Sequence, residues 1–364
     1  MPDPIKGRGA ISHVAHRFDP LTRAADGDWL DWTAAHDPDD PEALPAPTLR
    51  TRVSFETARS LITSNDSPDI PFDRSINPYR GCEHGCVYCY ARPTHSYLNL
   101  SPGLDFESRL VAKRNAAEVL ARELAAPAYR PSLIALGTAT DAYQPVEREL
   151  RIARGLLEVL AGTLHPVGIV TKSALIERDL DLLVPMAQAG VVQAYVSITT
   201  LDPELSRRLE PRAASPARRL RTVRTLAQAG VPVHVNFAPV IPFINEPELE
   251  RVLEAAAESG ARRCHYTVVR LPWEVAPLFQ EWLRVHYPER AERVMARIRE
   301  MRGGRDYEAR FGARMKGEGV WADLIRARFE AASRRLGLAV DTPPLRTDAF
   351  RPPAQPPGPQ LALF

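Results

Sequence analysis

Residues 81–90 read GCEHGCVYCY and contain three of the four cysteines of the chain, spaced by three residues and then by two. Thiols so close in sequence cannot crosslink distant parts of a fold, so we interpret them as metal ligands or redox groups. A loop of this length wraps three thiolates around one face of an iron–sulfur cubane and leaves the fourth iron without a cysteine ligand. An open iron is a site for a substrate, as an open zinc position is. We therefore predict that Cys82, Cys86 and Cys89 hold a [4Fe–4S] cluster.

Two other interpretations of the cysteines stay open at this point. A structural zinc site needs four ligands, and His84 is a candidate for the fourth, although it lies inside the same tight loop. A purely structural cluster normally has a fourth cysteine, and Cys264 is the only one that remains. The corresponding functions are a zinc-stabilised nucleic-acid-binding module and a non-radical iron–sulfur protein for electron transfer or sensing.

From about residue 73, short apolar runs alternate with helical patterns. The runs are nearly continuous, as in parallel strands that are buried on both faces. Six such units predict the α/β class, with a partial (βα)6 TIM-like barrel of parallel strands that falls short of the full eight. The expected strands are 74–79, 132–136, 167–171, 192–198, 233–237 and 263–269, and the expected helices are 107–124, 147–161, 179–188, 217–229 and 247–259.

The regions that flank this alternation differ from it in pattern. Of the 34 prolines, 16 lie in the first 75 and the last 25 residues. We expect an irregular N-terminal extension over 1–72, the barrel over 73–270, a C-terminal helical lid over 271–340 and a proline-rich tail over 341–364. Within the extension, the GRGA string at 7–10 and the run 51–67 look less random than the rest, which has the composition of a surface-hugging segment.

Composition excludes some classes of protein. Apolar residues make up 45% and charged residues 25% of the 364, which is typical of a packed core, and the net charge of +2 does not require a polyanionic partner. Arginines cluster within 207–224 and 297–319, where they either track a phosphate backbone or pair with the many glutamates, and the small net charge favours pairing. No run is long enough to span a bilayer, and the N-terminus lacks the apolar core of a signal peptide, so we expect a cytoplasmic protein without membrane partners.

The Cys-x3-Cys-x2-Cys spacing, with Tyr88 directly before the third cysteine, resembles the radical SAM superfamily. The strings NPYRGC at 77–82 and YCYAR at 88–92 resemble its spore photoproduct lyase-related branch, and the likeness covers about residues 50–330. The resemblance implies a [4Fe–4S] cluster, S-adenosylmethionine (SAM) and an external one-electron reductant of the flavodoxin or ferredoxin kind. It also implies reductive cleavage of SAM to a 5′-deoxyadenosyl radical that abstracts hydrogen from a substrate. Nucleic acid is the substrate class that analogy with this branch offers.

Ligands of parallel βα folds lie at the carboxyl ends of the strands, so the residues there are the candidates for binding SAM. After the second strand, Thr138, Thr140 and Asp141 stand where many superfamily members have Gly-Gly-Glu, and they offer hydroxyls and a carboxylate to the methionyl amine. Asp141 is equally suited to cap the next helix. After the third strand, Lys172 is the candidate for pairing with the methionyl carboxylate, the alternative being an ordinary surface lysine.

The resemblance implies further contacts. Ser197 corresponds to the ribose or carboxylate contact after the fourth strand, and Arg212 is a second candidate for the carboxylate or else a surface arginine. Ile241, after the fifth strand, corresponds to the apolar contact of the adenine ring, and Tyr88 is either a cofactor contact or simple loop packing.

The lyases also have a cysteine in the loop after the second strand that returns a hydrogen atom to the product radical. Thr138 stands about where it would be, which argues against spore-photoproduct repair, and Cys264 and Tyr143 are the other conceivable donors.

Overall fold

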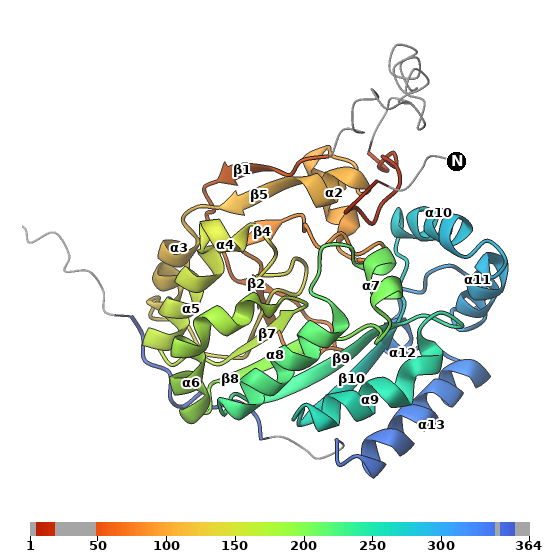
Figure 1. Cartoon of the computed structure of the whole chain (residues 1–364). Coiled ribbons are helices and arrows are strands. Elements are labelled where there is room, and N and C mark those ends of the chain that lie inside the picture. Colours follow the sequence, from red (N-terminus) through yellow and green to blue (C-terminus); the bar gives the residue numbers. More distant parts are fainter. Residues whose placement is uncertain (1–4, 19–48, 339–342, 354–364) are drawn as a thin grey trace, which may run out of the picture.

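The computed structural model describes residues 5–18, 49–338 and 343–353. Its main sheet has seven strands in the order β10-β9-β8-β7-β6-β3-β2 (Figure 1). Six of them run parallel in chain order, which confirms the expected α/β class, and among the described residues β10 and β2 remain as two unjoined edges of the sheet. The bounds are β2 Thr63–Ser64, β3 Arg74–Ile76, β6 Ile134–Leu136, β7 Val167–Thr171, β8 Val192–Ser197, β9 Val233–Val240 and β10 Arg263–Val268.

Helices follow the strands and cover the outer face of the sheet. The helices within the βα series are α3 Ala116–Leu124, α4 Glu147–Leu150, α5 Ile152–Gly162, α6 Leu180–Gln188, α7 Pro203–Leu209, α8 Pro216–Gln228 and α9 Leu249–Glu258, with 3-10 turns η2 Ala174–Asp179 and η3 Glu246–Glu248. Gly190 and Gly230 end two of these units at φ of 73° and 83°, a conformation that glycine adopts without strain. The C-terminal helices are α10 Val275–His286, α11 Ala291–Glu300, α12 Ala313–Lys316 and α13 Val320–Arg335.

The two faces of the sheet differ in chemistry. Alternate residues of each strand, such as Val233, Val235 and Phe237 of β9, are buried in one apolar core beneath the helices. The opposite face of the sheet, on which Ser197 lies, carries polar residues. Examples are Tyr195 of β8 and Asn236 of β9. The continuous apolar pattern that we expected for both faces therefore holds for the helix-covered face, and the inner face is partly polar.

The expected helix over 107–124 is wrong in its first half. There the chain forms a short helix α2 (Leu104–Ser108) and then strand β5 (Arg109–Lys113), and only α3 is helical as expected. β5 lies between β1 (Arg52–Glu56), to which it is parallel, and β4 (Tyr79–Arg80), to which it is antiparallel. Alternating burial along β5 and two strands that supply hydrogen-bond partners outweigh its helical propensity.

β1 and β2 also lie within the stretch that we expected to be irregular, in the run 51–67. The boundaries of the four expected parts stay a prediction. Residues 1–4 and 19–48 of the expected extension, 339–340 of the expected lid, and 341–342 and 354–364 of the expected tail lie outside the described residues. Among the described helices, none is both long and apolar enough to cross a membrane.

Candidate functional site

The cysteine loop (residues 81–90) follows β4 and leads into the 3-10 helix η1 (Arg92–Leu98). Its cysteines are free thiols, with Cys82 and Cys86 buried and Cys89 half-buried. Gly81 and Gly85 adopt φ of 79° and 66°, which lets the backbone turn between the cysteines. Burial raises the pKa of the Cys86 thiol to about 12, and the nearby Glu210 and Cys89 add to this effect while Lys172 opposes it.

The three thiols fit the ligand set of an iron–sulfur cluster. Cys89 packs against the apolar cluster that contains Cys86 and against the one that contains Cys82, so the three thiols lie close together. Burial, followed by nearby Asp141 and Cys86, raises the pKa of Cys82. Among the described residues, no three His, Cys, Asp or Glu side chains converge as ligands of a single metal ion. The thiolates of a cubane bind three different iron atoms and do not need to converge in that way.

A buried ion pair between Arg92 and Glu107 holds the backbone of the cysteine loop in place. Arg92 is fully buried and donates through Nε to the Cys86 carbonyl at 2.9 Å and through Nη2 to the Gly85 carbonyl at 3.2 Å. The same guanidinium pairs with the fully buried carboxylate of Glu107 at 2.5 Å. Since a buried charge is retained only when it is paired and hydrogen-bonded, this pair fixes the shape of the loop.

The loop after β6 (residues 137–146) lies beside the cysteine loop, but its polar groups are largely occupied. The Asp141 carboxylate accepts from the Lys172 backbone N–H at 2.7 Å and from the Thr171 hydroxyl at 2.8 Å, and His84 lies 3.3 Å away. Burial acts to raise the pKa of Asp141, but His84 and these hydrogen bonds outweigh it and lower the pKa to about 2. The Thr140 hydroxyl donates to the Tyr79 carbonyl at 3.2 Å.

Thr138 differs from these two residues. Its hydroxyl has no hydrogen bond to any residue that the structure describes, while its carbonyl accepts from the Tyr90 hydroxyl at 2.5 Å. Thr138 is therefore the member of the predicted trio with a free polar group, and Asp141 serves mainly to join the loops after β6 and β7.

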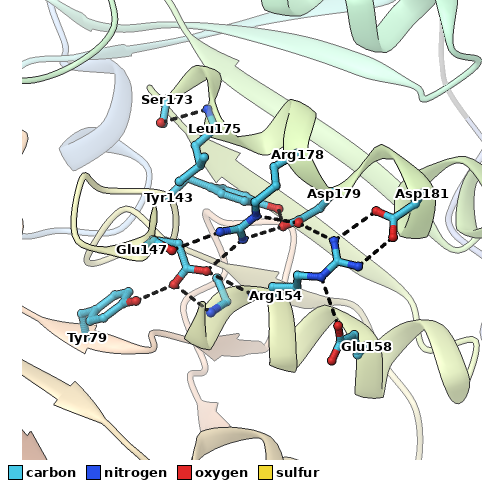
Figure 2. Close-up of polar contacts among 11 residues, drawn as sticks. Tyr79, Tyr143, Glu147, Arg154, Glu158, Ser173, Leu175, Arg178, Asp179 and Asp181 are labelled. Atoms are coloured by element: carbon cyan, nitrogen blue, oxygen red, sulfur yellow. Dashed lines mark hydrogen bonds and ion pairs between the residues drawn. The ribbon is translucent and has the colours of Figure 1, made fainter. Parts of the chain in front are cut away.

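Figure 2 shows the ion-pair network that anchors this loop. The Tyr143 hydroxyl donates to Asp179 at 3.0 Å, and Arg178 lies between Asp179 and Glu147 at 2.8 and 3.0 Å. Glu147 also accepts from the Tyr79 hydroxyl. Tyr143 is completely buried, so its hydroxyl is committed to the network and is not placed to donate hydrogen at the site.

Lys172 lies at the end of β7 and faces the cysteine loop. Its ammonium is 6.0 Å from the centre of the Tyr88 ring, and it has no hydrogen bond or ion pair to any residue within the described parts of the chain. Burial acts to lower the pKa of Lys172, but Cys86 and Glu210 outweigh it and raise the pKa above its ordinary value. A cation without a direct partner next to the thiols is suited to hold an anionic group of a ligand.

Glu210 was not among the predicted site residues. Its buried carboxylate accepts from the Tyr88 hydroxyl, from the Thr199 hydroxyl at 2.5 Å and from the guanidinium of Arg219. Arg219 donates in addition to the Ser197 carbonyl at 3.0 Å. This cluster joins the cysteine loop to the end of β8 and fixes Tyr88, which is 7% exposed, by packing and hydrogen bonding.

The remaining candidates also differ in whether their polar groups are already engaged within the protein. Ser197 is buried, and its hydroxyl has no hydrogen bond within the described residues. Ile241 is fully buried in the apolar cluster that contains Cys86 and Tyr88. Arg212 pairs with Glu83 of the cysteine loop at 3.0 Å, so its guanidinium is already engaged.

Comparison with known proteins places this arrangement in a family. The model of the Radical SAM superfamily matches residues 76–256, a span that contains the cysteine loop and every strand-end candidate. An uncharacterized protein of Mycobacterium bovis is 38% identical over 234 residues, which cover 64% of this chain and 68% of that protein. The PqqA peptide cyclase of Granulibacter bethesdensis is 29% identical over 112 residues, which cover 31% of this chain and 28% of the cyclase.

Solved structures agree on the fold. Spore photoproduct lyase complexed with dinucleoside spore photoproduct matches with a TM-score of 0.56 at 16% identity, covering 78% of this chain and 79% of the lyase. A mutant of the lyase with bound AdoMet and the same dinucleoside matches with a TM-score of 0.54 at 18% identity, covering 78% of each chain.

The chain therefore belongs to the radical SAM superfamily, whose members are enzymes of radical chemistry with a [4Fe–4S] cluster and SAM as cofactors. Within the superfamily its fold is that of a spore photoproduct lyase-like protein, as the resemblance of its cysteine motif implied.

Proposed function

We propose that Cys82, Cys86 and Cys89 hold the cluster and that Lys172 binds the carboxylate of SAM, so that the enzyme cleaves SAM reductively and abstracts hydrogen from a substrate. The observation that carries this proposal is the set of three buried or half-buried free thiols in one glycine-turned loop, with an ammonium beside them that lacks a direct partner. When bound, the cluster supplies the electron that cleaves the sulfonium, and the protein supplies binding, orientation and shielding.

The side chains have different roles in this proposal. The Lys172 ammonium, the Thr138 hydroxyl and the Ser197 hydroxyl have no hydrogen bonds within the described residues, so they are free to bind the polar groups of SAM. Ile241 supplies apolar surface next to the cysteine loop. Thr140, Asp141 and Arg212 instead hold the surrounding loops in place. Tyr88 orients the loop through Glu210.

The test begins with anaerobic reconstitution using iron and sulfide, followed by dithionite and SAM, with detection of 5′-deoxyadenosine. We expect a cluster spectrum and the nucleoside. A cluster that never yields the nucleoside would support the non-radical electron-transfer or sensor alternative, and a colourless zinc protein would support the zinc module.

Lys172→Ala separates binding of SAM from binding of the cluster. We expect the dissociation constant of SAM to rise by about tenfold or more, because one ion pair is lost, while the cluster spectrum is unchanged. Lys172→Arg, which keeps the charge, should restore part of the affinity. Equal SAM affinity in all three proteins, measured by equilibrium dialysis, would remove Lys172 from the binding site.

Nucleic acid is the substrate class that we propose to test first, because the lyase of similar fold is complexed with a dinucleoside. Repair of the same lesion is not proposed. By the resemblance of the motif, Thr138 stands about where the lyases have their hydrogen-donating cysteine. Tyr143 is committed to Asp179, and Cys264 lies in the apolar core on the helix-covered face. Transfer of deuterium from labelled DNA or RNA oligonucleotides into 5′-deoxyadenosine would identify the substrate class.

A further inference from the structure

The GRGA string at 7–10 belongs to a segment that packs against the backbone of the cysteine loop. We call residues 5–17 the strap. Figure 1 shows it between α2 and α10. The structure assigns the strap a function that rests on the proposed one: it is a positioning element that clamps the cysteine loop in the shape that accepts the cluster, so strap docking and cluster binding stabilise each other.

The first contact is made by backbone atoms of the strap. The N–H groups of Gly9 and Ala10 donate to the two oxygens of the Glu107 carboxylate at 2.9 and 2.8 Å. Arg92, which holds the carbonyls of Gly85 and Cys86, donates to the same carboxylate. Within the part of the chain that the structure describes, the strap therefore supplies two of the three donors to this buried carboxylate, and the third donor, Arg92, also binds the cysteine loop.

The second contact is steric. A Cβ atom on Gly9 would overlap the carbonyl oxygen of Gly85, and it would lie 3.3 Å from the Val87 nitrogen. The strap backbone thus lies directly on the backbone between Cys82 and Cys86. Gly9 is not one of the described glycines with a positive φ. A glycine is required at position 9 because of this close approach, and not because the backbone is strained there.

A third contact runs through Arg8. Its guanidinium donates to the Glu107 carbonyl at 2.6 Å and to the Thr51 hydroxyl at 3.2 Å. Thr51 in turn donates to Glu83 of the cysteine loop at 2.7 Å. The strap thereby reaches both ends of the Cys82–Cys86 spacing, from Glu83 to Gly85.

The other end of the strap is fixed to the C-terminal helical region. The Ser12 hydroxyl donates to Glu281 of α10 at 2.8 Å, and Ala10 packs with Leu278 of the same helix. Arg17 pairs with Glu274, directly before α10, at 2.9 Å. The strap therefore connects the cysteine loop with the helix that follows the last strand, and it holds the loop against a rigid element.

Two coupled equilibria change each other's free energy by the same amount, so the proposal predicts an effect in both directions. In the wild-type protein, removal of the cluster should speed hydrogen exchange of the peptide that covers residues 5–14 by about tenfold, while peptides of α9 stay unchanged. This experiment requires no variant. Identical exchange of residues 5–14 with and without the cluster would overturn the proposal.

The reverse direction uses Gly9→Ala, with Gly162→Ala as the matched control. Gly162 ends α5 and has open space around its Cβ position. After anaerobic reconstitution, we expect Gly9→Ala to lose iron to a chelator about tenfold faster than wild type and to show an altered EPR spectrum of the reduced cluster, with Gly162→Ala like wild type.

The outcomes separate this proposal from the proposed function. A wild-type protein that forms no cluster would contradict the proposed function itself. Clusters of equal lability and identical spectra in wild type and Gly9→Ala would contradict the strap alone. If Gly9→Ala does not fold, as judged by circular dichroism, the exchange measurement on the wild type decides.

Discussion

Glu210 shows how much a single residue contributes at this site. Its carboxylate is completely buried and pairs with Arg219, which is 1% exposed. Burial acts to raise the pKa of Glu210, but Arg219, Lys172 and the hydrogen bonds from Thr199 and Tyr88 outweigh it and lower the pKa. Replacing one partner of such a pair leaves the other charge buried without compensation.

Glu210→Gln should lower the free energy of unfolding by about 3 kcal/mol at pH 7, measured by urea denaturation. Because the pKa is lowered in the folded state, the stabilising effect is complete above the pKa of the unfolded chain and is lost as the pH falls through the folded pKa. The difference between the two proteins should therefore shrink below about pH 4.

Glu204→Gln is the matched control, because this glutamate is 61% exposed and pairs with Arg208 at the surface. A surface ion pair contributes little, so the change should be below about 0.5 kcal/mol. Equal effects of the two substitutions would show that the buried pair is not specially stabilising.

The cysteines give a second prediction for single residues. At pH 8, a thiol whose pKa is about 12 has about one thiolate in ten thousand molecules, and the thiolate is the reactive form. In folded, cluster-free protein, iodoacetamide should therefore alkylate half-buried Cys89 at least about tenfold faster than Cys86, as mass spectrometry of the peptides would show. Equal rates would mean that the loop opens without the cluster.

The sequence was informative about the cysteines because their spacing alone limits the chemistry. No local pattern identifies Glu210 as the partner of Arg219, because that pairing depends on how the loop after α7 folds onto β8. The sequence around Arg219 does indicate that this arginine needs a buried partner. Arg219 lies on the apolar face of α8, three, four and seven residues before Thr222, Val223 and Leu226, and a charge in that position requires a buried partner.

At the level of elements, β10 is an edge strand whose carbonyl groups are covered by long cationic side chains. Arg302, 2% exposed, donates to the carbonyls of Val268 and Val269 at 3.3 and 2.9 Å. Lys316 of α12 donates to the Tyr266 carbonyl at 2.8 Å. The segment after β10 thus satisfies backbone groups that would otherwise be available for pairing with another chain.

Arg302→Met should therefore destabilise the protein by about 2–3 kcal/mol, because buried carbonyls lose their donors. It should also increase aggregation on mild heating, followed by light scattering. Arg305→Met is the control, since Arg305 is exposed. If Arg302→Met were as stable and as soluble as Arg305→Met, other groups would have to satisfy these carbonyls.

The bounds of secondary-structure elements could be predicted from the sequence where a strand and the helix that follows it form one βα unit. β7 has the expected bounds, and β8 and β10 differ from expectation by one residue at one end. The failure at 109–113 has a different origin. β5 belongs to a second sheet whose partners, β1 and β4, lie more than 25 residues away in sequence, and short-range periodicity contains no information about them.

For the whole molecule, the balance of charge bears on nucleic-acid binding. Many guanidinium groups of the two arginine clusters are engaged within the protein, as in Arg218–Glu177, Arg297–Glu300, Arg299–Asp306, Arg310–Glu318 and Arg314–Asp69. For these arginines the structure shows pairing with acidic residues, as the small net charge favoured. Arg207, Arg221, Arg224 and Arg305 are exposed and have no ion pair within the described residues, so only part of each cluster is available to neutralise phosphates.

We accordingly expect weak, sequence-independent binding of single-stranded DNA, with a dissociation constant above about 10 µM at 150 mM salt. Fluorescence anisotropy across a range of salt concentrations measures both the affinity and its slope. Submicromolar binding with a steep salt dependence would contradict this expectation and indicate a phosphate-tracking surface. Weak binding leaves room for a substrate that is recognised locally, at a single base or a short fragment.

The contacts of the strap join parts of the chain that lie far apart in sequence. Ser12 and Glu281 are 269 positions apart, and Arg17 and Glu274 are 257 apart. A ribosome makes the strap first and α10 much later, so a nascent chain that already displays all three cysteines still lacks the helix against which the strap is fixed. We expect that stable insertion of iron and sulfide waits until α10 has been made, and that ribosome-stalled intermediates ending before α10 bind the metal only loosely.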